Sequence, residues 1–310
     1  MNSKSYELVI IGGGPAGASA GVYAARKQIK TAIIADSFGG QSIESDDIQN
    51  WIGTKSITGI NLAKSLKEHV KHYASSFVDI KEGERVELIS GDTDNFEVKT
   101  NKDTYKTRTI LIASGSSRKK LDIEGAKEFE GKGITYCASC DGPFFKDKEV
   151  VVIGGGNAGF ESAMQLLAYC KKVTLISRGD FKADPVTIEK ILLNHKFKAV
   201  PNAIPQKIIG DTMVKSLVYK TNSPFVVDEE IKADGIFVEI GHTPNTNFAK
   251  NILELDDFGR IIIDYKNQKT TKEGIWAAGD CSNILYHQNN IAAGDAVKAL
   301  EDIYLSLRKK

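Results

Sequence analysis

The sequence predicts an α/β fold with two β-turn-α-β units in two domains, the second domain being inserted in the first. Three observations support this prediction. The sequence VIIGGGPAG, which ends at Gly17, recurs as VVIGGGNAG, which ends at Gly159. An apolar, β-branched run precedes each glycine cluster, and a second such run follows the Ala-rich stretch after the cluster, as is typical of buried strands. The 310 residues are enough for about two domains.

Both units follow the order strand, turn, helix, strand. In the first unit we expect a strand over Glu7–Ile11, a helix over the Ala-rich stretch Pro15–Lys27 and a strand over Thr31–Ala35. Each unit is long enough for the crossover that parallel strands need. The second unit repeats the pattern over Val150–Ile153, Asn157–Lys171 and Val173–Ser177.

Three further strand-like runs end at Gly115, Gly241 and Asp280. The stretches GSSRKK from Gly115 and GHTPNT from Gly241 mix turn-forming and polar residues, so we expect hinges there. They bracket the second unit, so the middle of the chain would be an insert and the C-terminal part would complete the first domain. The expected domains are residues 1–115 with 245–310, and residues 118–242.

The spacing G-x-G-x-x-G occurs in both units and predicts two Rossmann-like dinucleotide sites. The first glycine permits a tight turn, the second lets the backbone approach a pyrophosphate, and the third lets the helix pack closely on the strand. The N–H groups at the helix start then face the phosphates. Glycine-rich turns that bind nothing are the alternative. The glycines are Gly12, Gly14 and Gly17, then Gly154, Gly156 and Gly159.

Asp36 and Arg178 hold the same position at the ends of the two second strands. An acid there accepts hydrogen bonds from free ribose hydroxyls and repels a 2′-phosphate, so the first site suits FAD or NAD. An arginine pairs with a 2′-phosphate through its planar fork. Ser177 and Lys182 add a hydroxyl and a charge nearby. The second site therefore favours NADPH, with NADH as the alternative, unless Arg178 is only a solvated surface cation.

Cys137 and Cys140 form the motif C-A-S-C inside the expected insert, followed by Asp141. Two cysteines at this spacing can close a small disulfide that opens and reforms easily. Half of a zinc site is the alternative, but no other Cys or His pair has ligand spacing, so we expect no metal. Asp141 is either a general acid for a leaving thiolate or a turn residue. Cys170 and Cys281 suit small buried apolar positions.

Composition excludes several classes of protein. Lys+Arg number 41 and Asp+Glu 40, so the net charge of +1 gives no reason to expect nucleic acid or an anionic membrane as a partner. Four cysteines are too few for a secreted disulfide framework. The uncharged run Leu8–Ala25 has the length of a signal core or short span, but clustered glycines and Pro15 interrupt it. We expect a cytoplasmic protein.

The chain resembles the low-molecular-weight thioredoxin reductases from end to end. The matching stretches are IIGGGPAGASAG, FGGQ, DIQNW from Asp47, ASG, CASCDGPFF, VIGGGNAGFESA and WAAGDCSN. FVEIGHTPNT and IIIDYKNQKT are similar to the flavoprotein core of the alkyl hydroperoxide reductase flavin subunit. The stretch SRGDFKAD departs from the pattern H-R-R-x-x-x-R of NADPH-using relatives and keeps only Arg178 and Lys182.

The resemblance implies FAD in the first site and a nicotinamide coenzyme in the second. It implies that Cys140 faces the flavin, that Cys137 attacks a partner's disulfide with Asp141 as the acid, and that the protein is a homodimer whose insert rotates. The expected FAD residues are Gly12, Gly14, Pro15, Ala16, Gly17, Asp36, Gly40, Gln41, Asn50, Ala113, Gly115, Gly279, Asp280, Gln288, Asn289 and Ile291. The expected NAD(P) residues are Gly154, Gly156, Asn157, Ala158, Gly159, Ser177, Arg178 and Lys182.

The expected activity is therefore that of a flavin-dependent thioredoxin-disulfide reductase. Electrons would pass from NAD(P)H to FAD, then to the Cys137–Cys140 disulfide, then to thioredoxin or a similar small redox protein. One alternative is a dithiol oxidase. Another is a disulfide reductase with a non-nicotinamide donor or a peroxiredoxin-linked partner. A third is a nucleotide-binding redox sensor without enzymatic activity.

Overall fold

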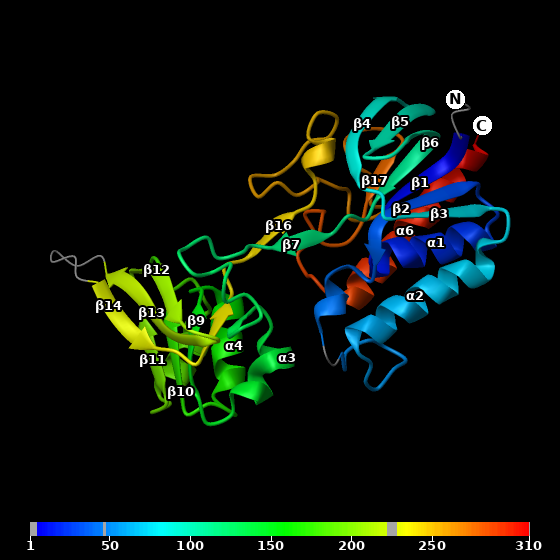
Figure 1. The fold of residues 1–310 in the computed structure, drawn as a ribbon. Coiled ribbons are helices and arrows are strands. Elements are labelled where there is room, and N and C mark those ends of the chain that lie inside the picture. Colours follow the sequence, from blue (N-terminus) through cyan, green and yellow to red (C-terminus); the bar gives the residue numbers. More distant parts are fainter. Residues whose placement is uncertain (1–4, 46–47, 222–227, 310) are drawn as a thin grey trace. The chain divides into compact units, whose positions relative to one another are not determined.

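The computed structural model describes residues 5–45, 48–221 and 228–309, without the side chains of Glu44, Ser139 and Cys140. Asp47 of the DIQNW stretch lies outside the described residues. The chain divides into two compact units (Figure 1). Unit 1 comprises Met1–Ser117 and Thr243–Lys310, and unit 2 comprises Arg118–His242.

Unit 1 is built on a seven-stranded sheet of β1 (Ser5–Gly13), β2 (Thr31–Phe38), β3 (Val78–Glu82), β4 (Val86–Asp92), β5 (Asn95–Thr100), β6 (Thr104–Ile112) and β17 (Ile275–Ala277). The strand order is β3-β2-β1-β6-β5-β4, and β17 pairs with β6. Strands β1, β2, β3, β6 and β17 are parallel, whereas β4 and β5 add antiparallel pairs. The expected strand over Glu7–Ile11 is therefore central.

Helices cover one face of this sheet, as Figure 1 shows. They are α1 (Pro15–Arg26), α2 (Gly59–Ala74) and α6 (Asn289–Arg308). Because side chains alternate along a strand, Leu8 and Ile10 of β1 pack with these helices. Val9 and Ile11 pack on the opposite face with β4, β5 and residues 248–284. This double burial explains why the strand is an uninterrupted apolar run.

Unit 2 has a five-stranded parallel sheet of order β11-β10-β9-β15-β8 and an antiparallel sheet of order β12-β13-β14. The first comprises β8 (Ile134–Thr135), β9 (Glu149–Ile153), β10 (Lys172–Ile176), β11 (Phe197–Val200) and β15 (Gly235–Val238). The second comprises β12 (Ala203–Gly210), β13 (Val214–Thr221) and β14 (Asp228–Lys232).

Strand β9 separates two buried clusters of unit 2. Val150 and Val152 pack with Phe160 of α4 (Asn157–Leu166), on the side that also holds α5 (Pro185–Leu192). Val151 and Ile153 pack toward the antiparallel sheet. Helix, parallel sheet and second sheet thus form three layers. The predicted α/β fold with two Rossmann-like units is confirmed.

One sequence expectation differs from the structure in detail, and a second gains detail from it. The helix expected over Asn157–Lys171 ends at Leu166, because the chain turns there and Lys171 N donates to the carbonyl of Lys148 (2.9 Å) at the start of β10. The two stretches expected to be hinges form short strands, β7 (Ser116–Arg118) and β16 (His242–Pro244), which pair with each other.

Candidate functional site

The glycine turn of unit 1 lies at the carboxyl end of β1 and is packed against its neighbours. Gly12 has φ +120°, and a Cβ there would lie 2.2 Å from the carbonyl oxygen of Ala113. A Cβ on Gly17 would lie 1.9 Å from the carbonyl oxygen of Gly12. The outer glycines of the motif are therefore needed by the fold itself, for the turn and for close packing of α1 on β1.

The second glycine turn, after β9, repeats this arrangement. Gly154 has φ +145°, and a Cβ there would lie 2.1 Å from the carbonyl oxygen of Glu239. A Cβ on Gly159 would lie 2.0 Å from the carbonyl oxygen of Gly154. The two turns thus share both geometry and sequence.

The middle glycine of each motif, Gly14 or Gly156, differs from the outer two, because neither its backbone conformation nor its packing requires a glycine. Gly14 has φ −73° and Gly156 has φ −94°, which are ordinary values for any residue. A Cβ on Gly156 meets no atom within 4 Å, and one on Gly14 comes only within 3.8 Å of Gly40 Cα. A glycine that neither conformation nor packing requires fits a site where an external group approaches the backbone.

The spacing G-x-G-x-x-G assigns no role to the residue between its first two glycines, which is Gly13 in the first turn and Gly155 in the second. A Cβ on Gly13 would lie 2.5 Å from the carbonyl oxygen of Ser37, and one on Gly155 would lie 2.2 Å from Ser177 Oγ. These contacts explain the run of three glycines in each turn. They also show that Ser177, which is buried, packs beneath the second turn.

The N-termini of α1 and α6 supply backbone N–H groups to the first site. In the described part of the chain, no side chain caps the N-terminus of α1 or of α6, whose N-cap residues are Gly14 and Gln288. The two helix starts meet at Gly279, where a Cβ would lie 3.6 Å from Ala16 Cβ and 3.2 Å from Ala292 Cβ. Two sets of free N–H groups and two positive dipole ends therefore face this edge of the sheet, as an anion requires.

The other residues expected at the first site gather at the same carboxyl edge, after β2, β6 and β17. Gln41 Nε2 donates to Ser116 Oγ (2.9 Å), beside Gly115, and Ser42 Oγ donates to Asn289 Oδ1 (3.1 Å).

Two more of the expected residues, Asn50 and Gln288, are far apart in the sequence but contact each other. Asn50 Nδ2 donates to Gln288 Oε1 (3.0 Å), and Asp280 Oδ1 lies 3.3 Å from His287 Nδ1. The remaining expected residues are Pro15 at the start of α1, exposed Asp36 at the end of β2, and Ile291 in α6.

The residues expected around the second nucleotide lie at the carboxyl ends of β9 and β10. Arg178 and Lys182 are exposed, whereas Ser177 is buried. Lys182 N donates to the carbonyl of Gly155 (2.7 Å), so the loop after β10 is attached to the glycine turn. Asn157 Oδ1 accepts from Asp184 N (2.8 Å), and Ala158 lies beside it in the first turn of α4, which no described side chain caps.

The cysteine motif follows β8, whose carboxyl end lies on the same edge of the parallel sheet as the second glycine turn. Cys137 is disulfide-bonded, and Cys170 and Cys281 are free. Burial raises the pKa of the Cys170 thiol to about 11. Asp141 ends the short α3 (Ala138–Asp141) before η2 (Gly142–Phe145), and its Oδ2 is hydrogen-bonded to Thr135 Oγ1. Thr135 could not be predicted from the sequence, because no spacing or periodicity singles it out.

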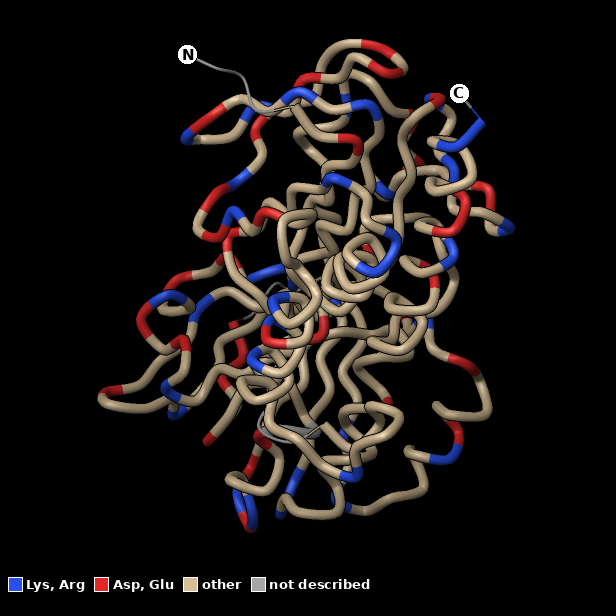
Figure 2. The backbone as a smooth tube through the Cα atoms, turned by 90° about the vertical axis from the view of Figure 1, so that its right-hand side faces the viewer, with Lys and Arg blue, Asp and Glu red and all other residues tan. Residues whose placement is uncertain are grey.

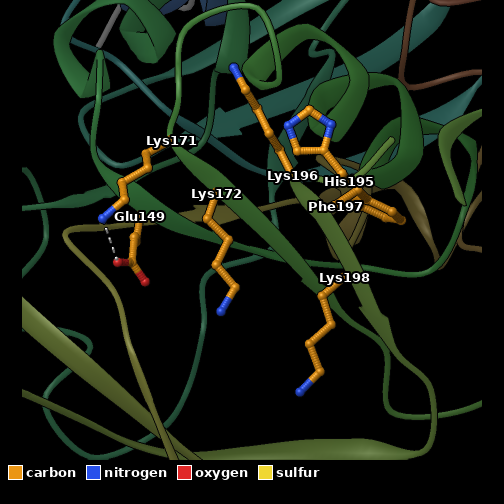
Figure 3. Close-up of a pocket in the computed structure, with 7 residues that line it drawn as sticks. All are labelled: Glu149, Lys171, Lys172, His195, Lys196, Phe197 and Lys198. Atoms are coloured by element: carbon orange, nitrogen blue, oxygen red, sulfur yellow. Dashed lines mark ion pairs between the residues drawn. The ribbon is translucent and has the colours of Figure 1, made fainter. Parts of the chain in front are cut away.

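A hollow of about 340 Å³ lies at the opposite edge, at the amino ends of β9, β10 and β11. Lysines dominate its lining, although basic and acidic residues are otherwise interspersed along the chain (Figure 2). Lys171 pairs with Glu149, and the side chains of Lys196 and Lys198 point away from each other (Figure 3). The ammonium groups therefore do not converge on one ligand.

Two kinds of feature are absent from the described residues. No three His, Cys, Asp or Glu side chains among them are grouped as a metal would need. None of the described helices combines the length and apolar character that crossing a membrane requires.

Two turns of the dinucleotide-binding kind, one in each unit, define a protein with two nucleotide-binding domains. The chain belongs to the pyridine nucleotide-disulphide oxidoreductase family, whose model matches residues 6–296. The predicted resemblance to the low-molecular-weight thioredoxin reductases is thereby confirmed.

Relatives of known name agree with this assignment. The chain is 36% identical over 300 residues to an NADH dehydrogenase of Bacillus subtilis (strain 168) and 38% identical over 305 residues to a subunit of the alkyl hydroperoxide reductase of Pseudomonas putida. Each match covers 96% of this chain but 58% of the relative. The crystal structure of Lactococcus lactis thioredoxin reductase is 31% identical, with a TM-score of 0.78, over 98% of this chain and 100% of that chain.

The family implies FAD and a pyridine nucleotide, and the residues present fit both groups. The open backbone at Gly14 and Gly156 would admit a pyrophosphate at each turn. The uncapped starts of α1, α4 and α6 would supply N–H donors to it.

Proposed function

We propose that the chain is a flavin-dependent disulfide reductase that takes electrons from NADPH and delivers them to thioredoxin or a similar small redox protein. FAD would lie on the glycine turn of unit 1, and NADPH on that of unit 2. The observation that supports this best is the pair of middle glycines, Gly14 and Gly156, whose open backbone would let a pyrophosphate approach. Arg178, exposed at the end of β10, favours the 2′-phosphate of NADPH.

The thiol chemistry would use residues of unit 2. When bound, FAD would accept a hydride from the coenzyme and pass the electron pair to the Cys137–Cys140 disulfide. The Cys137 thiolate would attack the partner's disulfide, forming a mixed disulfide and releasing one partner thiolate. The Cys140 thiolate would then attack Cys137, restoring the disulfide and releasing the second partner thiol. Asp141 would hold the proton that a leaving thiolate needs.

A second candidate partner is a peroxiredoxin-linked carrier. It is favoured by the 38% identity to a subunit of an alkyl hydroperoxide reductase. Because the chain spans only 58% of that relative, the activity of the whole relative does not transfer directly. We also propose a homodimer, which light scattering of the purified protein would measure.

Anaerobic titration of the purified yellow protein tests this function. NADPH, NADH and reduced ferredoxin are added in turn, and bleaching of the flavin identifies the donor. Thioredoxin and a peroxiredoxin-linked carrier are then compared as acceptors in steady-state turnover. Cys137→Ser should keep flavin reduction and lose protein-disulfide reduction. Full turnover by this variant would refute the mechanism.

The same preparation separates the other candidates. Protein that is colourless and does not take up FAD would point to a redox sensor. Peroxide release on adding a small dithiol, without a response to either coenzyme, would point to a dithiol oxidase.

A further inference from the structure

The hydroxyl of Thr135 connects the two ends of the cysteine motif. Thr135 is the last residue of β8 and is 9% exposed. Its Oγ1 accepts a hydrogen bond from Cys137 N (3.3 Å) and is hydrogen-bonded to Asp141 Oδ2. One buried hydroxyl therefore contacts both the backbone of the first cysteine and the carboxyl group that follows the second.

The same contacts argue against a purely local turn role for Asp141. Asp141 occupies the N-cap position of η2, yet in the described part of the chain its side chain makes no capping bond there. Its backbone is held separately, because Asp141 N donates to the carbonyl of Cys137 (3.1 Å). Thr135 Oγ1 thus holds the Asp141 carboxyl group by a hydrogen bond from the end of β8.

A hydroxyl suits this position because it can serve both protonation states of a carboxyl group. It already accepts the Cys137 N–H, so its own proton is directed to Asp141 when the carboxylate is ionised. By rotating, it can instead accept a hydrogen bond from the neutral carboxylic acid. Valine has the same shape and can do neither.

We propose that Thr135 is a positioning residue, which holds the Asp141 carboxyl group in place while it exchanges a proton with the thiols. This inference rests on the proposed function, in which Asp141 protonates a leaving thiolate. It assigns a role to a residue outside the C-A-S-C motif. It also explains why the strand before the motif ends in a buried polar residue.

The test measures disulfide opening without coenzyme. The oxidised holoenzyme is mixed anaerobically with dithiothreitol, and the new thiols are alkylated and counted by mass spectrometry. Thiolate attack breaks the S–S bond, and the departing sulfur takes the electron pair and then a proton. We expect Thr135→Val to slow this step about tenfold, as the loss of a hydrogen bond to a charged group does. Thr135→Ser should stay within about twofold of wild type, because it keeps the hydroxyl.

Asp141→Asn separates this inference from the function on which it rests. It should slow the step by about 100-fold, as loss of a general acid does. Thr135→Val should then add nothing in the Asp141→Asn background, because both changes remove the same function. A slow Asp141→Asn variant with a wild-type rate for Thr135→Val overturns the inference alone. An unchanged rate for Asp141→Asn overturns the proposed acid and the inference with it.

Thr174→Val is the matched control, because it removes another buried hydroxyl from the parallel sheet of unit 2, in β10. It should leave the rate unchanged; a slowdown equal to that of Thr135→Val would make the effect one of general packing and refute the role. If Thr135→Val does not fold, Thr135→Ala and Thr135→Ser decide. A slow alanine variant beside a normal serine variant supports the role, and equal rates overturn it.

Discussion

Replacing Gly156 with alanine separates nucleotide binding from folding. The backbone there, at φ −94° and ψ −178°, is acceptable for alanine, and the added methyl group meets no protein atom within 4 Å. The fold should lose only the preference of glycine over alanine at an N-cap, about 0.5–1 kcal/mol. The same methyl group would occupy the space where we expect the pyrophosphate.

The expected loss of binding follows from the bond removed. Keeping the pyrophosphate away from the backbone removes one hydrogen bond to a charged group, at about 1.5–3 kcal/mol. We therefore expect coenzyme to bind Gly156→Ala about 10- to 100-fold more weakly than wild type. The melting temperature of the protein should fall by only a few degrees.

Gly154→Ala is the matched comparison, two residues earlier in the same turn. It combines φ +145° with a Cβ 2.1 Å from the carbonyl oxygen of Glu239. Left-handed backbone costs about 1–2 kcal/mol. Overpacking adds about 1–3 kcal/mol. Thermal unfolding and coenzyme titration of both variants should show a stability defect in Gly154→Ala and a binding defect in Gly156→Ala. Unaltered coenzyme affinity in a folded Gly156→Ala protein would refute the placement of the second nucleotide.

Three further predictions use charge, burial and pH. Arg178→Glu should raise the KM for NADPH at least about tenfold more than that for NADH, and equal changes in steady-state assays would remove the arginine from the 2′-phosphate. Because burial raises the pKa of the Cys170 thiol to about 11, iodoacetamide at pH 8 should label Cys137 and Cys140 but not Cys170 in the reduced, folded protein, and mass spectrometry would detect an exception. Burial also raises the pKa of the Glu239 carboxyl group, so its ionisation opposes folding as pH rises above the ordinary value of 4.5. Glu239→Gln should therefore raise the melting temperature more at pH 7 than at pH 4, and a gain that is no larger at pH 7 would contradict this sign.

The glycine turns could be predicted from the sequence because their signal is local. The order of apolar run, glycine cluster and Ala-rich stretch is contained within about 30 residues, and the helices begin where that order places them. The motif also predicted that its first glycine is needed for a tight turn and its third for close packing of the helix on the strand. It could not show that Gly13 and Gly155 are equally constrained, because the atoms that exclude their Cβ groups belong to residues beyond the helix, Ser37 and Ser177.

Contacts between distant residues could not be predicted. The family resemblance places Asn50 and Gln288 at one site, but the hydrogen bond between them could not be predicted, because neither has a spacing that indicates the other. The stretches around Gly115 and Asn245 have turn-forming compositions, but they form strands because each supplies the other's hydrogen-bonding partner. Thr135 was missed for a related reason, since its importance arises only when α3 brings Asp141 back to it.

The chain leaves unit 1 and returns to it at adjoining atoms, because Asn245 N donates to the carbonyl of Gly115 (3.0 Å). Strands β6 and β17, which precede and follow the excursion, are already neighbours in one sheet. The buried clusters of each unit are also drawn from that unit alone. A short linker in place of unit 2 would thus break neither the sheet of unit 1 nor either of its buried clusters, as is typical of a domain inserted at a surface connection.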